Sequence, residues 1–569
     1  MAFQVSPGVE VKEIDATNAV PAVSTSIGGF AGSFNWGPTE QIVTVGSENE
    51  LAEVFGSPDD STAKHFLVAA SFLKYGNALK VVRVSSGHLN ATAQGTGQLI
   101  KNDEDYVNNY ADGSLNLGNW AAKHPGVLGN SLKVSMISQG ISDFSSWTYA
   151  DNFDAAPGTS TAAAAVGVTN DELHIAVIDE DGAISGTAGT VLETFGFLSQ
   201  ASDAKKDDGT SNYYKDVITN QSEYIRWIDH DTNLDEAGFT LAAAKAANTD
   251  SEGANTFKTH TSAMEASLSG GTDDNAPTTG EIAAGFDLLE DSETVDVNLL
   301  FAAADADGAE VIAEDLISIA NARKDCMAFI SPPIEDTVGS STPAANVKAF
   351  ADGLTSTSYA ACDSTALYVY DKYNDVYRYI AASGHMAGLC ANTDSVADAW
   401  FSPAGVNRGQ LLGVTKLAFN PKKADRDTLY KARVNPIVSL PGQGTLLFGD
   451  KTLLSRPSAF DRINVRRLFI ALEKAISTAA KAQLFEFNDE FTRAQFRNLV
   501  EPFLRDVKGR RGLTDFSVVC DTTNNTSQVI DTNKFVADIF IKPARSINFI
   551  SLNFVATRSG VEFSEISGS

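Results

Sequence analysis

The sequence is poor in cysteine and has no long apolar run. Only four cysteines occur among 569 residues (Cys326, Cys362, Cys390 and Cys520), and no two of them form a CxxC pair. Their scarcity excludes a disulfide scaffold and a cysteine-rich zinc module. No stretch of about 18 apolar residues occurs, and the N-terminus MAFQVSPGVEVKEID lacks the basic and apolar regions of a signal peptide. We therefore expect a soluble protein of a reducing compartment, with no direct membrane insertion.

Basic residues are also in short supply. The chain has 43 Lys and Arg against 72 Asp and Glu, a net charge of −29, which argues against a general nucleic-acid binder. The balance of charge differs along the chain: residues 1–415 hold 20 basic and 56 acidic residues, whereas residues 416–569 hold 23 basic and 16 acidic residues. The stretch 85–290 is acidic and rich in small polar residues, which predicts a solvated, loop-rich insertion with modest cores.

Motifs that could carry chemistry are incomplete. GTLLFGDKT (444–452) resembles a phosphate-binding loop, but Asp450 separates Gly449 from the lysine and breaks the register. DADG (305–308) resembles part of a calcium loop, although a turn before a helix is favoured. The seven histidines are scattered without HExxH, and no GxSxG occurs. We predict no catalytic, cofactor-binding or metal residues and no cofactor; a cytosolic enzyme with an acidic accessory domain stays open as an alternative of a different class.

Strand and helix patterns alternate along the chain. Residues 62–75 predict a helix and 79–84 a buried strand, while the strand–helix–strand order within 295–333 predicts a parallel sheet. Further strands are expected at 366–371, 375–381, 515–521, 536–542 and 546–556, and helices at 465–485 and 489–508. Near the N-terminus, Val9 and Val11 alternate with charged residues and have no hairpin partner, so this strand must pair with a distant segment or another chain. Together these patterns predict a mixed α/β protein.

The expected helix 489–508 has one apolar face, formed by Phe496, Leu499, Val500, Phe503, Leu504 and Val507. Basic residues fall within about 120° on a neighbouring face and continue beyond its end: Arg493, Arg497, Arg505, Lys508, Arg510 and Arg511. Pro502 is expected to kink this helix or to start its second half. Two interpretations stay open. The basic residues could form a solvated face that interacts favourably with the helix dipole, or a docking surface for an acidic partner.

Several segments, in order along the chain, carry a family resemblance. They are SPGVEVKEID (6–15), FLKYGNALKVVRV (72–84), FSPAGVNRGQL (401–411), VNPIVSLPGQGTLLFGDKTL (434–453), FDRINVRRLFIALEKAI (460–476), FEFND (485–489) and FLRDVKGRRGLTDFSVVCD (503–521). The chain thereby resembles the tail sheath proteins of contractile-tailed bacteriophages, of the large myovirus type. It departs from the family pattern at Phe487, Phe448 and Lys451, where the family usually has Pro, Trp and Arg.

The resemblance implies a multidomain α/β fold whose core is built from N- and C-terminal segments, with an outward-facing β-rich insertion and extended terminal arms. The implied domains are an arm at 1–20, a middle domain at 21–90 plus 291–440, an insertion at 91–290, and an inner C-terminal domain with a strand arm at 441–569.

The resemblance also implies a structural subunit rather than an enzyme. Such subunits polymerise as stacked hexameric rings around a tail tube in a metastable extended state, and contract to drive the tube through the host envelope. The implied partners are other copies of the chain, the tail tube protein, and baseplate and tail terminator proteins, but no nucleic acid. The implied location of the protein is the virion, after assembly in the host cytoplasm. A sheath of a phage-derived bacteriocin or injection system is the nearest alternative.

Two sets of site residues follow from the resemblance. The inter-subunit arms would use Val5, Pro7, Gly8, Val9, Val11 and Ile14 at one end and Phe549, Ile550, Leu552 and Phe554 at the other. The tube-facing helix would use Arg493, Arg497, Arg505, Lys508, Arg510 and Arg511.

Overall fold

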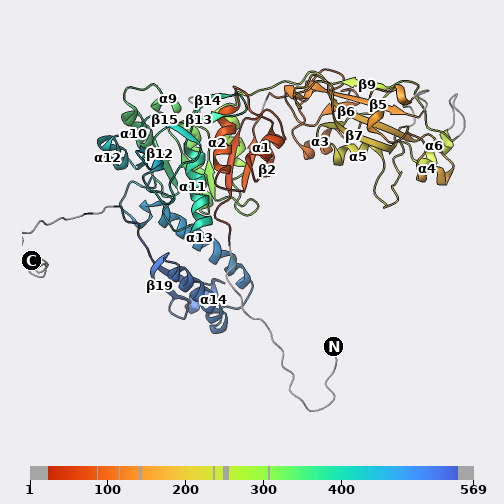
Figure 1. Cartoon of the computed structure of the whole chain (residues 1–569). Helices are drawn as coiled ribbons and strands as arrows, with labels where there is room; N and C mark the ends of the chain where they lie inside the picture. Colours follow the sequence, from red (N-terminus) through yellow and green to blue (C-terminus); the bar gives the residue numbers. More distant parts are fainter. Residues whose placement is uncertain are drawn as a thin grey trace, which may run out of the picture. The chain divides into compact units, whose positions relative to one another are not determined.

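The computed structural model describes residues 23–85, 87–113, 116–139, 144–234, 237–247, 255–304, 308–548 and 551. The chain divides into two compact units (Figure 1). The larger comprises Ser24–Ala397 and Pro403–Asp461, and the smaller contains Asp398–Ser402 and the chain from Arg462 onward. All the predicted arm residues lie outside the described residues: Val5, Pro7, Gly8, Val9, Val11, Ile14, Phe549, Ile550, Leu552 and Phe554.

A seven-stranded sheet forms the centre of the larger unit. Its strands, in order across the sheet, are β16 (Val434–Asn435), β12 (Ala360–Asp363), β11 (Met327–Ile330), β10 (Leu299–Phe301), β1 (Gly28–Gly32), β3 (Leu79–Arg83) and β2 (Ile42–Val45). Neighbours run parallel except β2, which is antiparallel to β3. The predicted strand–helix–strand unit is present as β10, α8 (Ala309–Arg323) and β11, with Leu299 opposite Met327.

Helices cover both faces of this sheet. Helices α2 (Ala63–Leu73) and α11 (Ser383–Val396) pack together over one face, and α7 (Thr279–Asp287) and α8 over the other. Strand β1 fits between the two helix layers because its glycines have no side chains. A Cβ on Gly28 would clash with Phe72 at 2.8 Å, and a Cβ on Gly29 would clash with Val297 at 2.8 Å. The predicted helix 62–75 and strand 79–84 are therefore confirmed as α2 and β3.

The insertion contributes two smaller sheets. Strands β7 (Thr190–Ser199), β6 (Glu172–Asp179), β5 (Leu132–Ser138) and β9 (Met264–Ser267) form an antiparallel sheet, and β4 (Trp120–Ala122) pairs with β8 (Ile225–Trp227). Short helices accompany them: α3 (Asp103–Asn109), α4 (Thr161–Val166), α5 (Tyr214–Gln221) and α6 (Leu241–Ala247). Trp120 lies directly opposite Trp227 and both are buried. These large side chains give the region a core that its small-residue composition conceals.

Two antiparallel sheets complete the larger unit. One has the order β14 (Val376–Ile380), β13 (Leu367–Asp371) and β15 (Val414–Leu417), which confirms two predicted strands. The other pairs β17 (Ile437–Leu440) with β18 (Gly444–Leu447). The remaining helices are α1 (Glu48–Phe55), α9 (Ile334–Thr337), α10 (Pro343–Gly353) and α12 (Lys423–Lys431).

The smaller unit consists of helices α13 (Ile463–Ala480), α14 (Glu490–Gly509) and α15 (Ser527–Asp531), and of strands β19 (Leu513–Val519) and β20 (Asp538–Pro543). Both predicted long helices are present, although α13 ends five residues before the expected 485. Residues 546–548 of the expected last strand are not in a strand, and most of the rest of it lies outside the described residues. The predicted mixed α/β, multidomain fold is confirmed.

Candidate interaction surface

Helix α14 forms the centre of the apolar core of the smaller unit. The Asp489 carboxylate caps it by accepting a hydrogen bond from the Thr492 backbone nitrogen (2.8 Å), and Pro502 lies inside the helix. Its buried side chains pack with those of α13 and β19 in one cluster: Phe496, Val500, Leu504 and Val507 with Leu468, Leu472, Ile476 and Leu513. The apolar face predicted from the sequence is the face that packs, with Leu499 and Phe503 half-buried beside it.

The predicted basic face divides into groups with different environments. The Arg493 side chain is buried, and its Nη1 donates to the backbone oxygen (3.1 Å) and the Oδ1 (2.8 Å) of Asn488. Arg493 therefore braces the loop before α14 and does not face solvent. Arg497 is half-buried, near Cys520 and Asp521.

The remaining cations lie toward the C-terminal end of α14 and are exposed. Lys508 pairs with Asp515 (3.2 Å), and the guanidinium of Arg510 pairs with Asp398 and Asp506. Neither Arg505 nor Arg511 has an ion-pair partner in the part of the chain that the structure describes. Of the six predicted residues, these two are therefore the cations most available to an external partner.

An apolar loop precedes α14 and was not singled out by the sequence. We call Leu484, Phe485 and Phe487, together with Phe491 in the first turn of α14, the phenylalanine loop; their exposed fractions are 63%, 104%, 84% and 75%. Phe485 also adopts a left-handed backbone conformation (φ 70°), which is uncommon for a bulky residue. The loop is held in place by Asn488, whose Nδ2 donates to the backbone oxygen of Lys534 (2.8 Å). The signal in the sequence was the alternation FEFND, which places phenylalanine where the resembled family often has proline.

Strands β19 and β20 form a two-stranded antiparallel sheet beside α14. Phe516 lies opposite Ile541 and Val518 opposite Ile539, and these four side chains pack, partly buried, on the cluster around α14. Neither strand has a second neighbour among the described residues. Each therefore presents one open edge of backbone donors and acceptors to a further strand.

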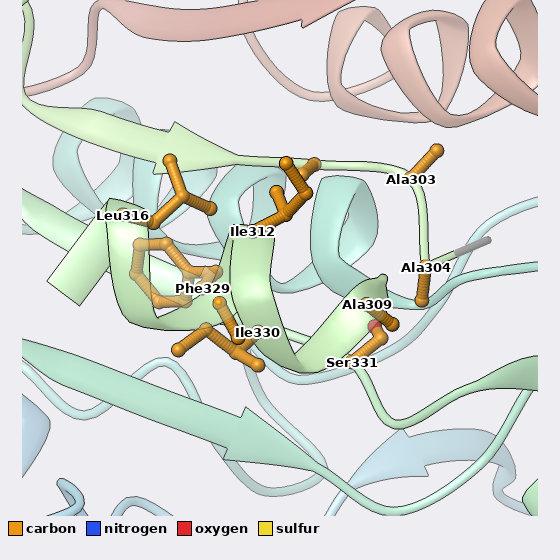
Figure 2. Close-up of a pocket in the computed structure, with 10 residues that line it drawn as sticks. Ala303, Ala304, Ala309, Ile312, Leu316, Phe329, Ile330 and Ser331 are labelled. Atoms are coloured by element: carbon orange, nitrogen blue, oxygen red, sulfur yellow. The ribbon is translucent and has the colours of Figure 1, made fainter. Parts of the chain in front are cut away.

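Among the described residues, a small apolar hollow lies at the carboxyl ends of β10 and β11, the edge at which open α/β sheets bind ligands. Figure 2 shows Ala303, Ile312, Phe329 and Ser331 around it, and its volume is about 10 Å³. That volume accommodates about one water molecule and no substrate.

The segment that resembles a phosphate-binding loop is part of the packed fold. Lys451 Nζ donates to the backbone oxygen of Tyr430 (2.7 Å), and Asp450 is buried. The Lys451 ammonium group therefore binds a backbone carbonyl of the protein itself. Within the described residues, no cluster of three or more His, Cys, Asp or Glu side chains could hold a metal ion, and no helix is long and apolar enough to span a bilayer.

Three family models match the chain. Residues 25–84 match the model described as the tail sheath protein Gp18 domain III N-terminal region. Residues 275–453 match the phage tail sheath protein central domain, and residues 455–557 match the phage tail sheath C-terminal domain. The segment 85–274 lies between the first two matches.

Curated relatives align over almost the whole chain. The tail sheath protein of Vibrio phage KVP40 is 34% identical, with 99% of each chain covered. The tail sheath protein of Enterobacteria phage T4 is also 34% identical with 99% of each chain covered, and that of Salmonella phage ViI is 31% identical over 99% of this chain and 98% of its own.

Solved structures share the fold. The helical sheath of the anti-feeding prophage in the contracted state is 13% identical, with a TM-score of 0.51 over 98% of this chain and 100% of its own. The sheath tail protein of Listeria innocua is 11% identical, with a TM-score of 0.52 over 92% of this chain and 93% of its own.

Proposed function

The chain belongs to the phage tail sheath family, and we propose that it polymerises as stacked hexameric rings around a tail tube and contracts to drive that tube through a host envelope. The family consists of structural proteins, and the chain is a sheath subunit and not an enzyme. Its place is the virion, and assembly in the host cytoplasm is part of the proposal.

The observation that carries the proposal is the open sheet of β19 and β20. Its apolar face is only partly buried on α14, so a further strand would cover the rest of that face. The proposed occupants are terminal arms from neighbouring subunits, in which Val9 and Val11 alternate with charged residues. Such strand addition would link each subunit to its neighbours through backbone hydrogen bonds.

Backbone pairing suits a sheath that changes its length. Each hydrogen bond of an added strand contributes about 1 kcal/mol net, so a few of them hold an arm firmly. The connection depends on the arm and the sheet alone, which leaves the bodies of the subunits free to rotate. The energy for contraction would reside in the packing of those bodies, held in the extended state by a kinetic barrier.

Docking to the tube is proposed for the open side of α14. In α14 and the turn that follows it, Arg505 and Arg511 are exposed cations without an ion-pair partner among the described residues, and Arg497 is half-buried nearer the start of the helix. An acidic tube surface would be held in register by these charges. The solvated-face interpretation stays the alternative, since Lys508 and Arg510 already satisfy their charges within the unit.

The other partners and the domain arrangement complete the proposal. Residues 441–569 would lie inward against the tube, 21–90 plus 291–440 would form the middle of the wall, and 91–290 would face outward. Baseplate and tail terminator proteins would contact the two ends of the polymer.

Disulfide trapping tests the arm exchange. The four native cysteines are buried, so introduced cysteines would react selectively. If Val9 and Val11 cover the apolar face, Glu10 between them points to the opposite face of the sheet, which Ser517 and Phe540 also share. Chains carrying Glu10→Cys would be mixed with chains carrying Ser517→Cys on β19 or Phe540→Cys on β20, and assembled under mild oxidation. We expect a disulfide-linked dimer with one of the two acceptors, formed in assembled material and not in free subunits. A Val107→Cys acceptor, on the exposed surface of α3, is the matched control.

If neither acceptor cross-links in assembled tubes, the proposed arm exchange is wrong. If the full chain forms no tubes or rings with or without a tube protein, the sheath function itself is contradicted.

A further inference from the structure

One face of the sheet β14–β13–β15 is covered with tyrosine. The pairs Tyr368–Tyr379 and Tyr370–Tyr377 lie directly opposite each other on β13 and β14. The intervening residues Leu367, Val369 and Ile380 point to the other face and are buried. We call Tyr368, Tyr370, Tyr377 and Tyr379 the tyrosine platform.

The platform is a continuous row of rings. The Tyr368 ring centroid lies 4.6 Å from that of Tyr379 and 5.3 Å from that of Tyr377, and Tyr377 lies 5.2 Å from Tyr370. Tyr370 and Tyr377 are half exposed, at 47% and 50%. Neighbouring β15 places Lys416 Nζ 4.4 Å from the Tyr368 ring centroid. The surface therefore presents aromatic area with the cation of Lys416 beside Tyr368 and one carboxylate, Asp375, which accepts a hydrogen bond from the Tyr370 hydroxyl (2.6 Å).

Ion pairs and hydrogen bonds fix the hairpin that carries the platform. Arg378 Nε pairs with the buried carboxylate of Asp371 (2.9 Å), and Lys372 Nζ pairs with Glu48 on α1 (3.1 Å). Asn374 Nδ2 donates to the backbone oxygen of Pro58 (2.9 Å). A surface fixed in this way loses little conformational entropy when a partner covers it.

The strand β15, which pairs with β13 beside the platform, belongs to a basic stretch of the sequence. Residues 403–435, which include β15 and α12, hold seven Lys and Arg against two Asp. Residues 24–365 hold 16 Lys and Arg against 49 Asp and Glu. One chain therefore has a basic stretch that includes the strand beside the exposed aromatic surface, and a long acidic stretch elsewhere.

We propose that the tyrosine platform and Lys416 form a contact surface for an acidic surface, within residues 24–365, of a second copy of this chain. Tyrosines supply large, rigid contact area with a polar tip, and aromatic residues are enriched at protein interfaces. Because the two complementary regions differ, the contact is head-to-tail and repeats from copy to copy, as a ring or helical polymer requires. The inference rests on the proposed sheath function and adds a contact between subunit bodies to the arm exchange.

Assembly measurements test the contact. The double variant Tyr370→Ala/Tyr377→Ala and the single variant Lys416→Glu should each raise the critical concentration for polymerisation about tenfold, because a contact at every subunit step is weakened. Tyr370→Phe/Tyr377→Phe, which keeps the rings, should polymerise nearly as the parent does. Val396→Ala, an exposed apolar side chain on α11 outside both proposed contact regions, is the matched control and should leave the critical concentration unchanged. Circular dichroism would verify that every variant folds.

Photo-cross-linking identifies the occupant. A benzoylphenylalanine at position 377 in assembled tubes should cross-link to peptides from residues 24–365 of another copy. Cross-links to the tube protein or to residues 403–569, or an unchanged critical concentration in both the alanine and glutamate variants, would overturn this inference while tubes still form. A parent chain that forms no polymer would instead overturn the sheath function, and the inference with it.

Discussion

The guanidinium group of Arg510 lies 5.1 Å from the ring centroid of Trp400, and the indole nitrogen of Trp400 donates a hydrogen bond to the Arg510 backbone oxygen (3.1 Å). Asp398 pairs with the same guanidinium. The short segment Asp398–Ser402 therefore belongs with the smaller unit because Trp400 and Asp398 hold the end of α14. A Cβ on Gly512 would lie 3.1 Å from the Trp400 ring, so the chain after α14 is also fitted to the indole.

We predict that Trp400→Ala destabilises the smaller unit by about 2–3 kcal/mol, because the replacement removes a large packed side chain together with its hydrogen bond. Hydrogen exchange should show lost protection at the end of α14 and in β19, with the seven-stranded sheet unaffected. Trp400→Phe keeps a ring and should cost about 1 kcal/mol. Equal protection in the alanine variant and the parent would show that the 398–402 segment does not support α14.

The phenylalanine loop should matter for assembly and not for folding. Phe485, Phe487 and Phe491 are largely exposed, so Phe→Ser at all three positions removes little buried area and should shift the melting temperature by no more than a few degrees. The free subunit should become more soluble and polymerise less readily, since exposed apolar clusters mark contact surfaces. Phe496→Ser, on the buried face of α14, is the control and should unfold the unit. Unimpaired polymerisation of the triple variant would exclude the loop from the assembly contacts.

Periodicity in the sequence located α13 and α14 and the buried face of α14, because apolar spacing reports which side packs. It could not separate Arg493 from Arg505. Both fall in one angular sector of the helix, but the loop around Asn488 folds over Arg493 and leaves Arg505 open. That difference depends on residues outside the helix, which a helical projection does not contain.

Reversing charge on α14 should therefore have two outcomes. Arg505→Glu/Arg511→Glu leaves the packed core untouched and should weaken assembly on the tube more than polymerisation without it, with the effect reduced at high salt. Arg493→Glu removes the donors that hold Asn488 and should instead destabilise the smaller unit. Co-sedimentation with and without tube protein, beside melting curves, distinguishes the two. Equal loss of both kinds of assembly in the double variant would refute docking through these arginines.

Stability should fall as the pH rises toward neutrality because of Asp363. Burial raises the pKa of Asp363 from 3.8 to about 7, while hydrogen bonds from Ser331 and the Thr365 backbone oppose the shift. Between pH 3.8 and about 7, the Asp363 carboxyl is protonated in the folded state and ionised in the unfolded state. The resulting stabilisation is fully present below about pH 4 and is lost as the pH rises to about 7. Asp363→Asn should flatten this dependence, whose slope is about 1.4 kcal/mol per pH unit, and raise the melting temperature at pH 8.

Asp371 provides the matched control. Although burial acts against it, hydrogen bonds from Asn374 and Arg378 lower the pKa of Asp371, so its carboxylate stabilises the fold at neutral pH. Asp371→Asn should thus lower the melting temperature at pH 8, the opposite sign. Melting curves from pH 4 to 8 would contradict this account if both variants changed stability in the same direction at pH 8.

The candidate surfaces were harder to predict than the fold. The alternation in 366–371 and 375–381 predicted both strands of the tyrosine platform, but not that its tyrosine face lies open, since that depends on which elements pack against the sheet. The sequence analysis discounted the resemblance to a phosphate-binding loop because of Asp450, and in the structure Lys451 Nζ donates a hydrogen bond to the Tyr430 backbone oxygen. Residues 91–290 offered composition alone, which concealed the paired Trp120 and Trp227.

Negative-stain electron microscopy of the purified full chain, mixed with its tube protein, tests the sheath function most directly. The account predicts tubes with a regular ring repeat around a central tube, and their replacement by separate folded subunits when residues 1–14 are deleted. Discrete small particles from the full chain under the same conditions, or unchanged tubes from the deletion variant, would contradict it.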